Sequence, residues 1–457
     1  MASTQLTKTF ANNGNRKTMT FSFWVKRGTL GTNQYPFSIY DSSSGLQADI
    51  RFITTDIHRM YATDTSTNTS LSFQTNRVFR DTSAWYHIVW AIDTTQATES
   101  NRVKLYVNGV QETSFSQAIY PSQNLDLRWN GNDNGDTGGV NYIGAINGGN
   151  YLDGSMSHIN FIDGTAYDAS YFGEFDANGV WTINTSPSVT YGTNGYFILK
   201  DGNSVTDQSG NSNDWTVGGG TLTNTLDCPD NVFCTMNPLI PSNGVFSEGN
   251  TTVTTTSSSW CTIGSTYGVT SGKWYWEVKA NLLSGSTSNF YTMIGFVRLQ
   301  GNSSDIGSNT TSHLGSNNGV GIYSANGNLY YPSSSTSYGS GYQTSGTIIG
   351  ISLDLTNNYA YWSIDGTWQN SGDPESGATG TGGYNLSSFA DGSFISPASS
   401  VQNYSSSNKS ENEYNFGSPP FAISSGNTDG NGFGNFEYAV PTGYLSLNTK
   451  NLAAVLA

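Results

Sequence analysis

Paired carboxylates are the first chemistry to test in this sequence, because two acidic side chains about 5 Å apart can hydrolyse a glycosidic bond. The nearest approach to such a pair on one strand is Glu174-Phe175-Asp176, but Gly179 stands where a third acid would complete an E-x-D-x-x-E pattern. None of the four histidines lies in a G-x-S-x-G or H-E-x-x-H context: His58, His87, His158 and His313. We therefore predict no catalytic residue, no enzymatic activity, and packed or hydrogen-bonded roles for the histidines.

One acidic, glycine-containing loop, residues 132–136 (NDNGD), could bind a hard cation. Calcium prefers carboxylate and backbone carbonyl oxygens, which makes Asp133 and Asp136 the candidate calcium ligands. The D-x-D-G pattern of an EF-hand is absent, and polar turns of this composition also form without a metal. Both interpretations of the loop stay open.

A cluster of aromatic residues in a Ser/Gly-rich stretch could bind carbohydrate. Tyrosine and tryptophan offer rigid amphipathic surface at a low cost in conformational entropy, and a sugar ring can stack on them. Packing in the core or along sheet edges is the alternative role for such rings. The predicted ligand-binding residues are Tyr330, Tyr331, Tyr338, Tyr342 and, just beyond an Asp-Gly turn, Trp368.

The composition narrows the elements that can position these residues. The 457 residues include 18 basic and 33 acidic side chains, a net charge of −15, and only 11% of residues are charged. So few charges exclude long solvated helices, and 13% aromatic residues exclude a disordered chain. The acidic balance argues against nucleic-acid binding. We also expect no signal peptide and no membrane insertion, because no apolar run approaches the roughly 18 residues of a span.

Alternation with a period of two residues predicts strands along most of the chain. Residues 21–25 and 103–107 alternate in this way, and the second run leads into Asn108-Gly109. Asn-Gly after such a run is a strong signal for a tight hairpin turn. The one helical turn that we expect in the first half lies near residues 168–172.

The same pattern returns after residue 250. Residues 349–355 and 360–364 alternate, and Asp365-Gly366 follows them. In residues 273–279, Trp274, Trp276 and Val278 are predicted to face a core, with the intervening side chains on the opposite face. The sequence therefore predicts an all-β protein of two antiparallel sandwiches, each with a buried face between its sheets.

Three segments of the first half resemble the laminin-G/concanavalin-A-like lectin family. They are residues 19–27 (MTFSFWVKR), 85–111 (WYHIVWAIDTTQATESNRVKLYVNGVQ) and 142–164 (YIGAINGGNYLDGSMSHINFIDG), which stand in the order of the family pattern. The resemblance covers about the first 170 residues. It implies a jelly-roll sandwich, and a calcium ion held at a loop rim, where Asp133 and Asp136 would serve.

The second half resembles a SPRY domain. The segments that carry the resemblance are residues 271–278 (SGKWYWEV), 321–330 (GIYSANGNLY), 349–372 and 394–417. SPRY domains are also two-sheet sandwiches of concanavalin-like topology, so the resemblance implies two variants of one fold in a single chain.

The pairing of these modules is similar to structural proteins of tailed bacteriophages, as are residues 207–215 (DQSGNSNDW), 227–238 (DCPDNVFCTMNP) and 441–452 (PTGYLSLNTKNL). That similarity implies a tail fibre, appendage or head-decoration protein on the virion surface, made in the host cytoplasm. It also implies a homo-oligomer, with a trimer favoured, that contacts other virion proteins and a host-surface glycan or receptor. A purely architectural protein binding only viral partners is the alternative, and a glycan depolymerase is the third.

These observations divide the chain into four predicted parts. Residues 1–170 form the lectin-like sandwich and residues 171–243 a connecting subdomain rich in Gly and Asn. Residues 244–418 form the SPRY-like sandwich, and residues 419–457 a C-terminal tail with a short ordered motif.

Overall fold

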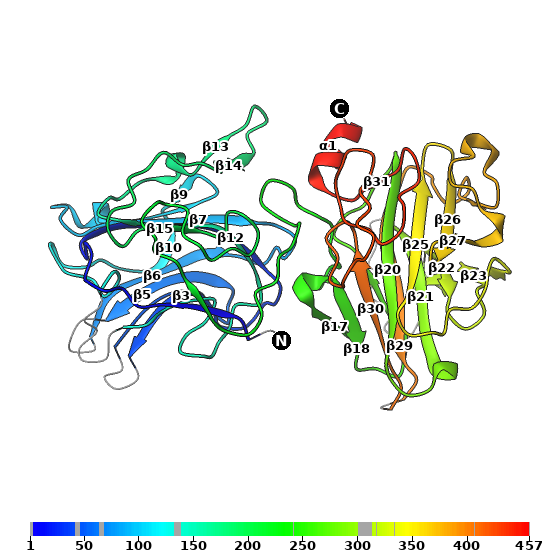
Figure 1. Cartoon of the computed structure of the whole chain (residues 1–457), viewed down its shortest axis with the longest axis horizontal. Helices are drawn as coiled ribbons and strands as arrows, with labels where there is room; N and C mark the ends of the chain where they lie inside the picture. The colour runs from blue at the N-terminus through cyan, green and yellow to red at the C-terminus, as the bar shows by residue number, and fades with distance from the viewer. Residues whose placement is uncertain are drawn as a thin grey trace. The chain divides into compact units, whose positions relative to one another are not determined.

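The computed structural model describes residues 3–41, 46–63, 68–131, 139–240, 242–299, 313–316, 318–332, 334–405 and 407–456. The predicted calcium ligands Asp133 and Asp136 lie outside these residues. The chain divides into two compact units (Figure 1): residues 1–224 with 228–230, and residues 225–227 with 231–457. Each unit contains two large β-sheets, which confirms the all-β prediction of two sandwiches.

The first unit pairs a sheet of eight strands with a sheet of six. The eight-stranded sheet runs β10 (Phe115–Ile119), β6 (Thr69–Val78), β5 (Ile57–Thr63), β4 (Leu46–Phe52), β3 (Gln34–Asp41), β11 (Asn141–Ile143), β1 (Gln5–Lys8) and β16 (Thr216–Gly219). The six-stranded sheet runs β15 (Tyr196–Ile198), β12 (Gly154–Asp163), β2 (Thr18–Arg27), β7 (Tyr86–Asp93), β8 (Val103–Val107) and β9 (Val110–Glu112). A separate hairpin joins β13 (Gly173–Phe175) to β14 (Trp181–Ile183), and 3-10 turns span η1 (Glu99–Asn101) and η2 (Ala169–Tyr171).

The predicted alternation in β2 is confirmed, because Phe21, Phe23 and Val25 pack in the core between the two sheets. Their neighbour Trp24 is buried as well, on the outer face of the same sheet. There the ring of His87 lies between Trp24 and Trp181, with centroids at 4.8 Å and 5.9 Å. A segment predicted to be part of a connector thus covers one outer face of the first sandwich.

The helical turn and the hairpin of this unit follow the sequence. Asp168 caps η2 by accepting a hydrogen bond from the Ser170 N–H at 2.9 Å. Asn108 and Gly109 both have positive φ, 48° and 79°, as the predicted tight turn requires.

The second unit contains a sheet of nine strands and a sheet of six. The larger runs β17 (Gly244–Ser247), β18 (Thr252–Thr255), β30 (Lys409–Asn415), β20 (Lys273–Ser284), β25 (Thr347–Asp354), β26 (Tyr359–Ile364) and β27 (Thr367–Trp368), with β28 (Tyr384–Asn385) on β26 and β31 (Leu445–Ser446) parallel to β20. The smaller runs β19 (Cys261–Gly264), β29 (Phe394–Asn403), β21 (Phe290–Leu299), β22 (Gly319–Tyr323), β23 (Leu329–Tyr331) and β24 (Ser334–Thr336). The helical segments are η3 (Glu248–Asn250), η4 (Thr287–Asn289), η5 (Leu314–Ser316), η6 (Gln369–Ser371), η7 (Gly377–Thr379) and α1 (Thr449–Leu456).

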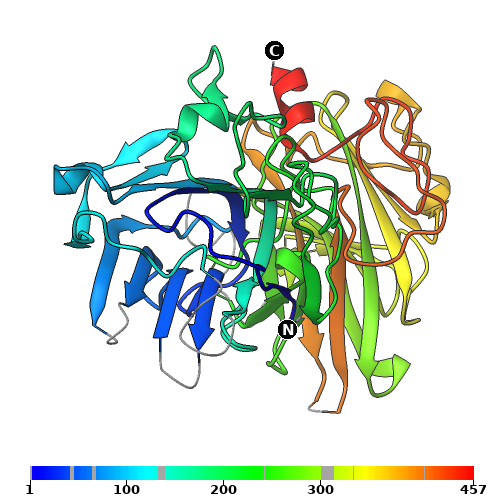
Figure 2. The ribbon, with the colours of Figure 1, turned by 60° about the vertical axis from the view of Figure 1, so that its left-hand side comes forward.

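The core of the second unit confirms the predicted orientation of β20 and shows that its outer face is covered as well. Trp274, Trp276 and Val278 are buried between the sheets, as predicted. Tyr275 and Glu277, predicted on the opposite face, are buried too, and Glu277 is 0% exposed. The cause is the C-terminal cover, our name for residues 419–456, whose β31 pairs with β20 (Figure 1) and whose helix α1 is drawn in red in Figure 2.

Glu277 fastens the C-terminal cover to the sheet. Its carboxylate accepts hydrogen bonds from the backbone N–H groups of Glu437 and Tyr438 at 3.0 and 2.8 Å. The Tyr275 hydroxyl and the Asn415 amide donate to it as well. Burial raises the pKa of Glu277, and these hydrogen bonds oppose that effect.

Two predicted segment boundaries therefore change. The connecting subdomain at 171–243 is not a separate part, because β15 and β16 complete the sheets of the first unit. Residues 231–240 belong to the second unit, where the Cys234 N–H donates to the carbonyl of Leu447 at 2.9 Å. The predicted tail at 419–457 is an integral cover of the second sandwich, because Phe436 and Tyr444 pack on Tyr275.

We predict that Glu277→Gln loosens the C-terminal cover. The amide NH₂ would face backbone donors that now point at a carboxylate oxygen, and leaving such a buried donor unsatisfied costs about 1–3 kcal/mol. Hydrogen exchange of residues 419–456 should accelerate, and the free energy of unfolding should fall by that amount. The exposed Glu248→Gln is the matched control and should change neither quantity measurably. Equal exchange rates in both variants would contradict the assignment.

Candidate functional site

The structure does not bring the five predicted aromatic residues together. Tyr342 is 2% exposed and donates its hydroxyl to the carbonyl of Ile322 at 2.9 Å. Tyr338 is 6% exposed and packs edge-on against Trp362, with the ring centroids 5.5 Å apart. The prediction of an exposed tyrosine loop is wrong for these two residues, because the loop folds back onto the core and buries both rings.

The remaining three predicted residues lie in strands, and each packs against a different part of the second unit. Tyr330 and Tyr331 are consecutive in β23, so their side chains lie on opposite faces of the sheet. The ring of Tyr331 contacts that of Tyr384, with the two centroids 5.6 Å apart. Tyr330 packs on the opposite face of the sheet. Trp368 packs against the cluster under the C-terminal cover. Only Tyr330 belongs to the site described next.

The outer face of the six-stranded sheet in the second unit carries a set of half-exposed aromatic rings. Neighbouring centroids are 5.5–6.1 Å apart, which is contact distance for edge-on and tilted pairs. Tyr404 at one end is 53% exposed. We call this set the aromatic face: Trp260, Tyr291, His313, Tyr323, Tyr330 and Tyr404.

Strand register explains why these rings meet. In β21, Ile294 and Phe296 point into the core, so Tyr291 and Met293 point outward. Met293 is paired with Tyr323 on β22, which places that ring beside Tyr291 on the same outer face. The rings rest on a small apolar cluster of Met293, Val297, Leu314 and Ala398.

A glycine makes room for the base of the aromatic face. Leu314 is buried against the outer surface of β22, above Gly321. A Cβ atom at position 321 would lie 2.8 Å from both Leu314 and Met293, closer than carbon atoms approach. Only glycine therefore lets Leu314 lie flat on the sheet beneath the rings.

The aromatic face carries no formal charge at neutral pH. Burial lowers the pKa of His313, so its imidazole is neutral. Burial, helped by neighbouring Tyr291 and Tyr330, raises the pKa of Tyr323 to about 12, so its hydroxyl stays protonated. The face thus offers uncharged rings and hydroxyl groups.

Of the aromatic face, the sequence predicted only Tyr330 as a binding residue, whereas His313 was predicted to have a packing role. The other four members come from four separate strands and loops, so the sequence alone does not bring them together. A usable signal existed in the segment 290–297 (FYTMIGFV), where apolar residues occupy both alternating sets of positions. A strand that is apolar on both faces needs a cover or a partner on its outer face.

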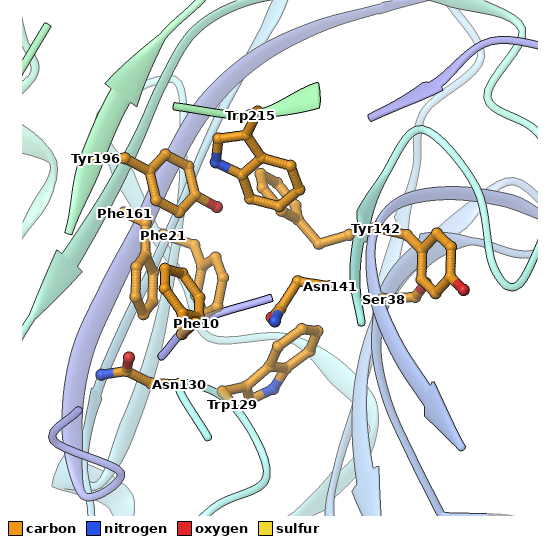
Figure 3. Close-up of a pocket in the computed structure, with 11 residues that line it drawn as sticks. Phe10, Phe21, Ser38, Trp129, Asn130, Asn141, Tyr142, Phe161, Tyr196 and Trp215 are labelled. Atoms are coloured by element: carbon orange, nitrogen blue, oxygen red, sulfur yellow. The ribbon is translucent and has the colours of Figure 1, made fainter. Parts of the chain in front are cut away.

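The cavity of the first unit is too small for a sugar. It has a volume of about 10 Å³, enough for about one water molecule, and lies among core aromatic rings (Figure 3). Within the described residues the indole N–H groups of Trp129 and Trp215, both on its lining, have no hydrogen-bond partner.

The acidic residues and the histidine that were considered for catalysis make contacts that stabilise the fold. Glu174 and Asp176 are exposed on the β13–β14 hairpin, where Asp176 accepts the N–H groups of Asn178 and Val180 and closes its own turn. His87 is hydrogen-bonded to Ser22 and accepts from the Trp181 indole at 3.0 Å, and burial lowers its pKa to about 3. The predicted packed role is confirmed for this histidine.

Among the described residues, no group of three or more His, Cys, Asp and Glu side chains is placed to hold a metal ion. No helix within the same residues has the length and apolarity needed to cross a membrane.

Comparison with known proteins identifies both units. Residues 2–170 match the model of the concanavalin A-like lectin/glucanases superfamily of laminin-G type, and residues 273–381 match the SPRY domain. The chain therefore carries a concanavalin A-like, laminin-G-like domain followed by a SPRY domain.

Solved structures give more distant similarities. The SPRY domain of human HERC1 is 19% identical over 39% of this chain and 96% of that one, with a TM-score of 0.28. A heptameric SAP-like pentraxin from Limulus polyphemus is 12% identical over 36% of this chain and 72% of that one, with a TM-score of 0.26. No curated protein matches the chain.

We predict that Gly321→Ala disturbs the aromatic face. The added methyl group must displace Leu314 or Met293, and overpacking of this kind costs about 1–3 kcal/mol. Chemical denaturation should show that loss in the free energy of unfolding. Gly430→Ala is the control, because nothing lies within 4 Å of a Cβ atom there. A Gly321→Ala protein as stable as the control would refute the packing described for Leu314.

Proposed function

We propose that this protein is a non-enzymatic adhesion protein that binds a host-surface glycan through the aromatic face of its SPRY domain. The observation that carries the proposal is the set of six adjoining, half-exposed, uncharged rings on one sheet. Exposed apolar patches of this kind mark interaction sites on protein surfaces.

Sugars suit this surface chemically. A tyrosine or tryptophan ring offers a flat apolar area to the C–H groups of a sugar, and the tyrosine hydroxyl can hydrogen-bond to its hydroxyl groups. Because no member of the aromatic face is charged, the preferred ligand is a neutral sugar. Tyr404, at the exposed end, is the ring most accessible for stacking.

The two outer faces of the second unit differ, and the difference supports the proposal. The outer face of the nine-stranded sheet is occupied by the C-terminal cover, held by Glu277. The outer face of the six-stranded sheet instead carries half-exposed rings. The chain therefore supplies its own cover for one apolar face and presents rings on the other.

We further propose that the protein works on the surface of a bacteriophage virion, as a tail fibre, appendage or head-decoration protein. The support is the resemblance of residues 207–215, 227–238 and 441–452 to such proteins. On a virion it would form a homo-oligomer, with a trimer favoured, and contact other virion proteins. A purely architectural role, in which the same face binds a viral partner, is the alternative.

We predict that Tyr404→Ala weakens binding to neutral host-surface polysaccharide by about five- to tenfold, the effect of losing one stacked ring. Isothermal titration with purified polysaccharide measures this directly. Tyr171→Ala removes a ring that is 43% exposed in the other unit and is the matched control. It should bind as the unaltered protein does.

Other outcomes separate the alternatives. Equal affinity in the two variants would remove the aromatic face as the glycan site. Absence of glycan binding by the unaltered protein, together with a changed oligomeric state in Tyr404→Ala, would favour the architectural role. Release of reducing ends from the polysaccharide would favour a depolymerase.

A further inference from the structure

The eight-stranded sheet of the first unit holds two arginines directly opposite each other on its outer face. Arg51 on β4 and Arg59 on β5 are register partners. Their strand neighbours Ile50 and Met60 point into the core, so both guanidinium groups project from the outer side. Like charges directly opposite destabilise a sheet, and this chain has only 18 basic residues to place. We call these two residues the arginine pair.

Two tyrosine rings and a carboxylate orient the arginine pair. Arg51 lies over the ring of Tyr35, with its guanidinium carbon 5.0 Å from the centroid, and donates to the Tyr35 hydroxyl. Arg59 lies over the ring of Tyr61 at 4.2 Å. Arg51 also forms an ion pair at 3.3 Å with Asp49, which is fully buried. The guanidinium planes are therefore fixed before any ligand arrives.

The charges of this cluster do not balance. Asp49 pairs with Arg51 alone, and burial raises the pKa of Asp49 to about 6 in spite of the two nearby guanidinium groups. Within the described residues Arg59 has neither an ion pair nor a hydrogen-bond acceptor, and its Nε atom is buried. The terminal N–H groups of Arg59 are the ones that reach the surface, and a bound anion would neutralise their charge.

The surroundings of the arginine pair suit a sugar chain. Gln74 is the register partner of Arg59 on β6, and Ser72 is the partner of Tyr61. Both donate to the amide oxygen of Gln117 at 2.7 Å, which forms a polar row beside the arginines. The half-buried ring of Tyr61 and the half-buried amides of Gln74 and Gln117 lie next to a cationic pair, and such groups recognise an acidic sugar rather than a small free anion.

The geometry points to a second binding site, in which the arginine pair holds the carboxylate of a uronic acid residue in a glycan. The planar fork of Arg59 matches the two oxygens of a carboxylate, and Arg51 supplies the second positive charge. The ring of Tyr61 provides a stacking surface for the same sugar. This site lies in the lectin-like domain and does not depend on the aromatic face.

Arg59→Gln tests the proposal, with oligogalacturonate as the probe and isothermal titration as the measurement. We expect binding by the unaltered protein and a loss of tenfold or more in Arg59→Gln, because charge-assisted bidentate hydrogen bonds disappear. Arg77→Gln removes the same charge from an ion pair with Glu112 in the same unit, away from the arginine pair, and should retain full affinity. Unchanged affinity in Arg59→Gln, or no binding by the unaltered protein, would overturn the proposal.

Two further measurements sharpen the test. A sulfated oligosaccharide and inorganic phosphate serve as comparison ligands, and tighter binding of either would overturn the carboxylate assignment. The melting temperature of Arg59→Gln should stay equal or rise, since a repulsion across the strands is removed. A lower melting temperature would mark Arg59 as a structural residue instead. Tyr404→Ala should bind oligogalacturonate normally, which separates failure of this proposal from failure of the aromatic face.

Discussion

A β-strand directs alternate side chains to two faces, and only one of these faces can pack between the layers of a sandwich. Whether another segment of the chain covers the outer face of a sheet decides which surfaces of this molecule can bind a ligand. In the first unit, Trp24 and His87 on the six-stranded sheet lie under the segment that contains Trp181. In the second, Tyr275 and Glu277 on the nine-stranded sheet lie under the C-terminal cover. The other two sheets carry half-exposed polar or aromatic side chains on their outer faces, and both proposed sites lie there.

The sequence predicted what depends on near neighbours. Alternation placed Trp274, Trp276 and Val278 in the core, and Asn108-Gly109 in a hairpin with positive φ. It could not predict the covers, because each joins segments far apart in the chain. Glu277 and Tyr438, which share a hydrogen bond, are 161 positions apart. Nothing local to Glu277 distinguishes it from a carboxylate on a solvated face.

The same reasoning explains the mixed result for the candidate site. Tyrosines in a Ser/Gly-rich segment suggested exposure, yet Tyr342 needs only one carbonyl, that of Ile322, to be buried at little cost. Such a partner is invisible in the sequence. Tyr291 and Tyr323, in contrast, are not predicted from the sequence, because their meeting depends on the pairing of β21 with β22. Their outward positions follow from the same alternation once the strand pairing is known.

The central claim is that the aromatic face is open to solvent in the free protein and is occupied when a glycan binds. Tyrosine-selective chemical labelling, followed by mass spectrometry, measures this at single residues. The account predicts that Tyr404 is labelled in the free protein and protected by saturating glycan, whereas buried Tyr275 is unlabelled in both states. Equal labelling of Tyr404 with and without bound glycan would contradict it.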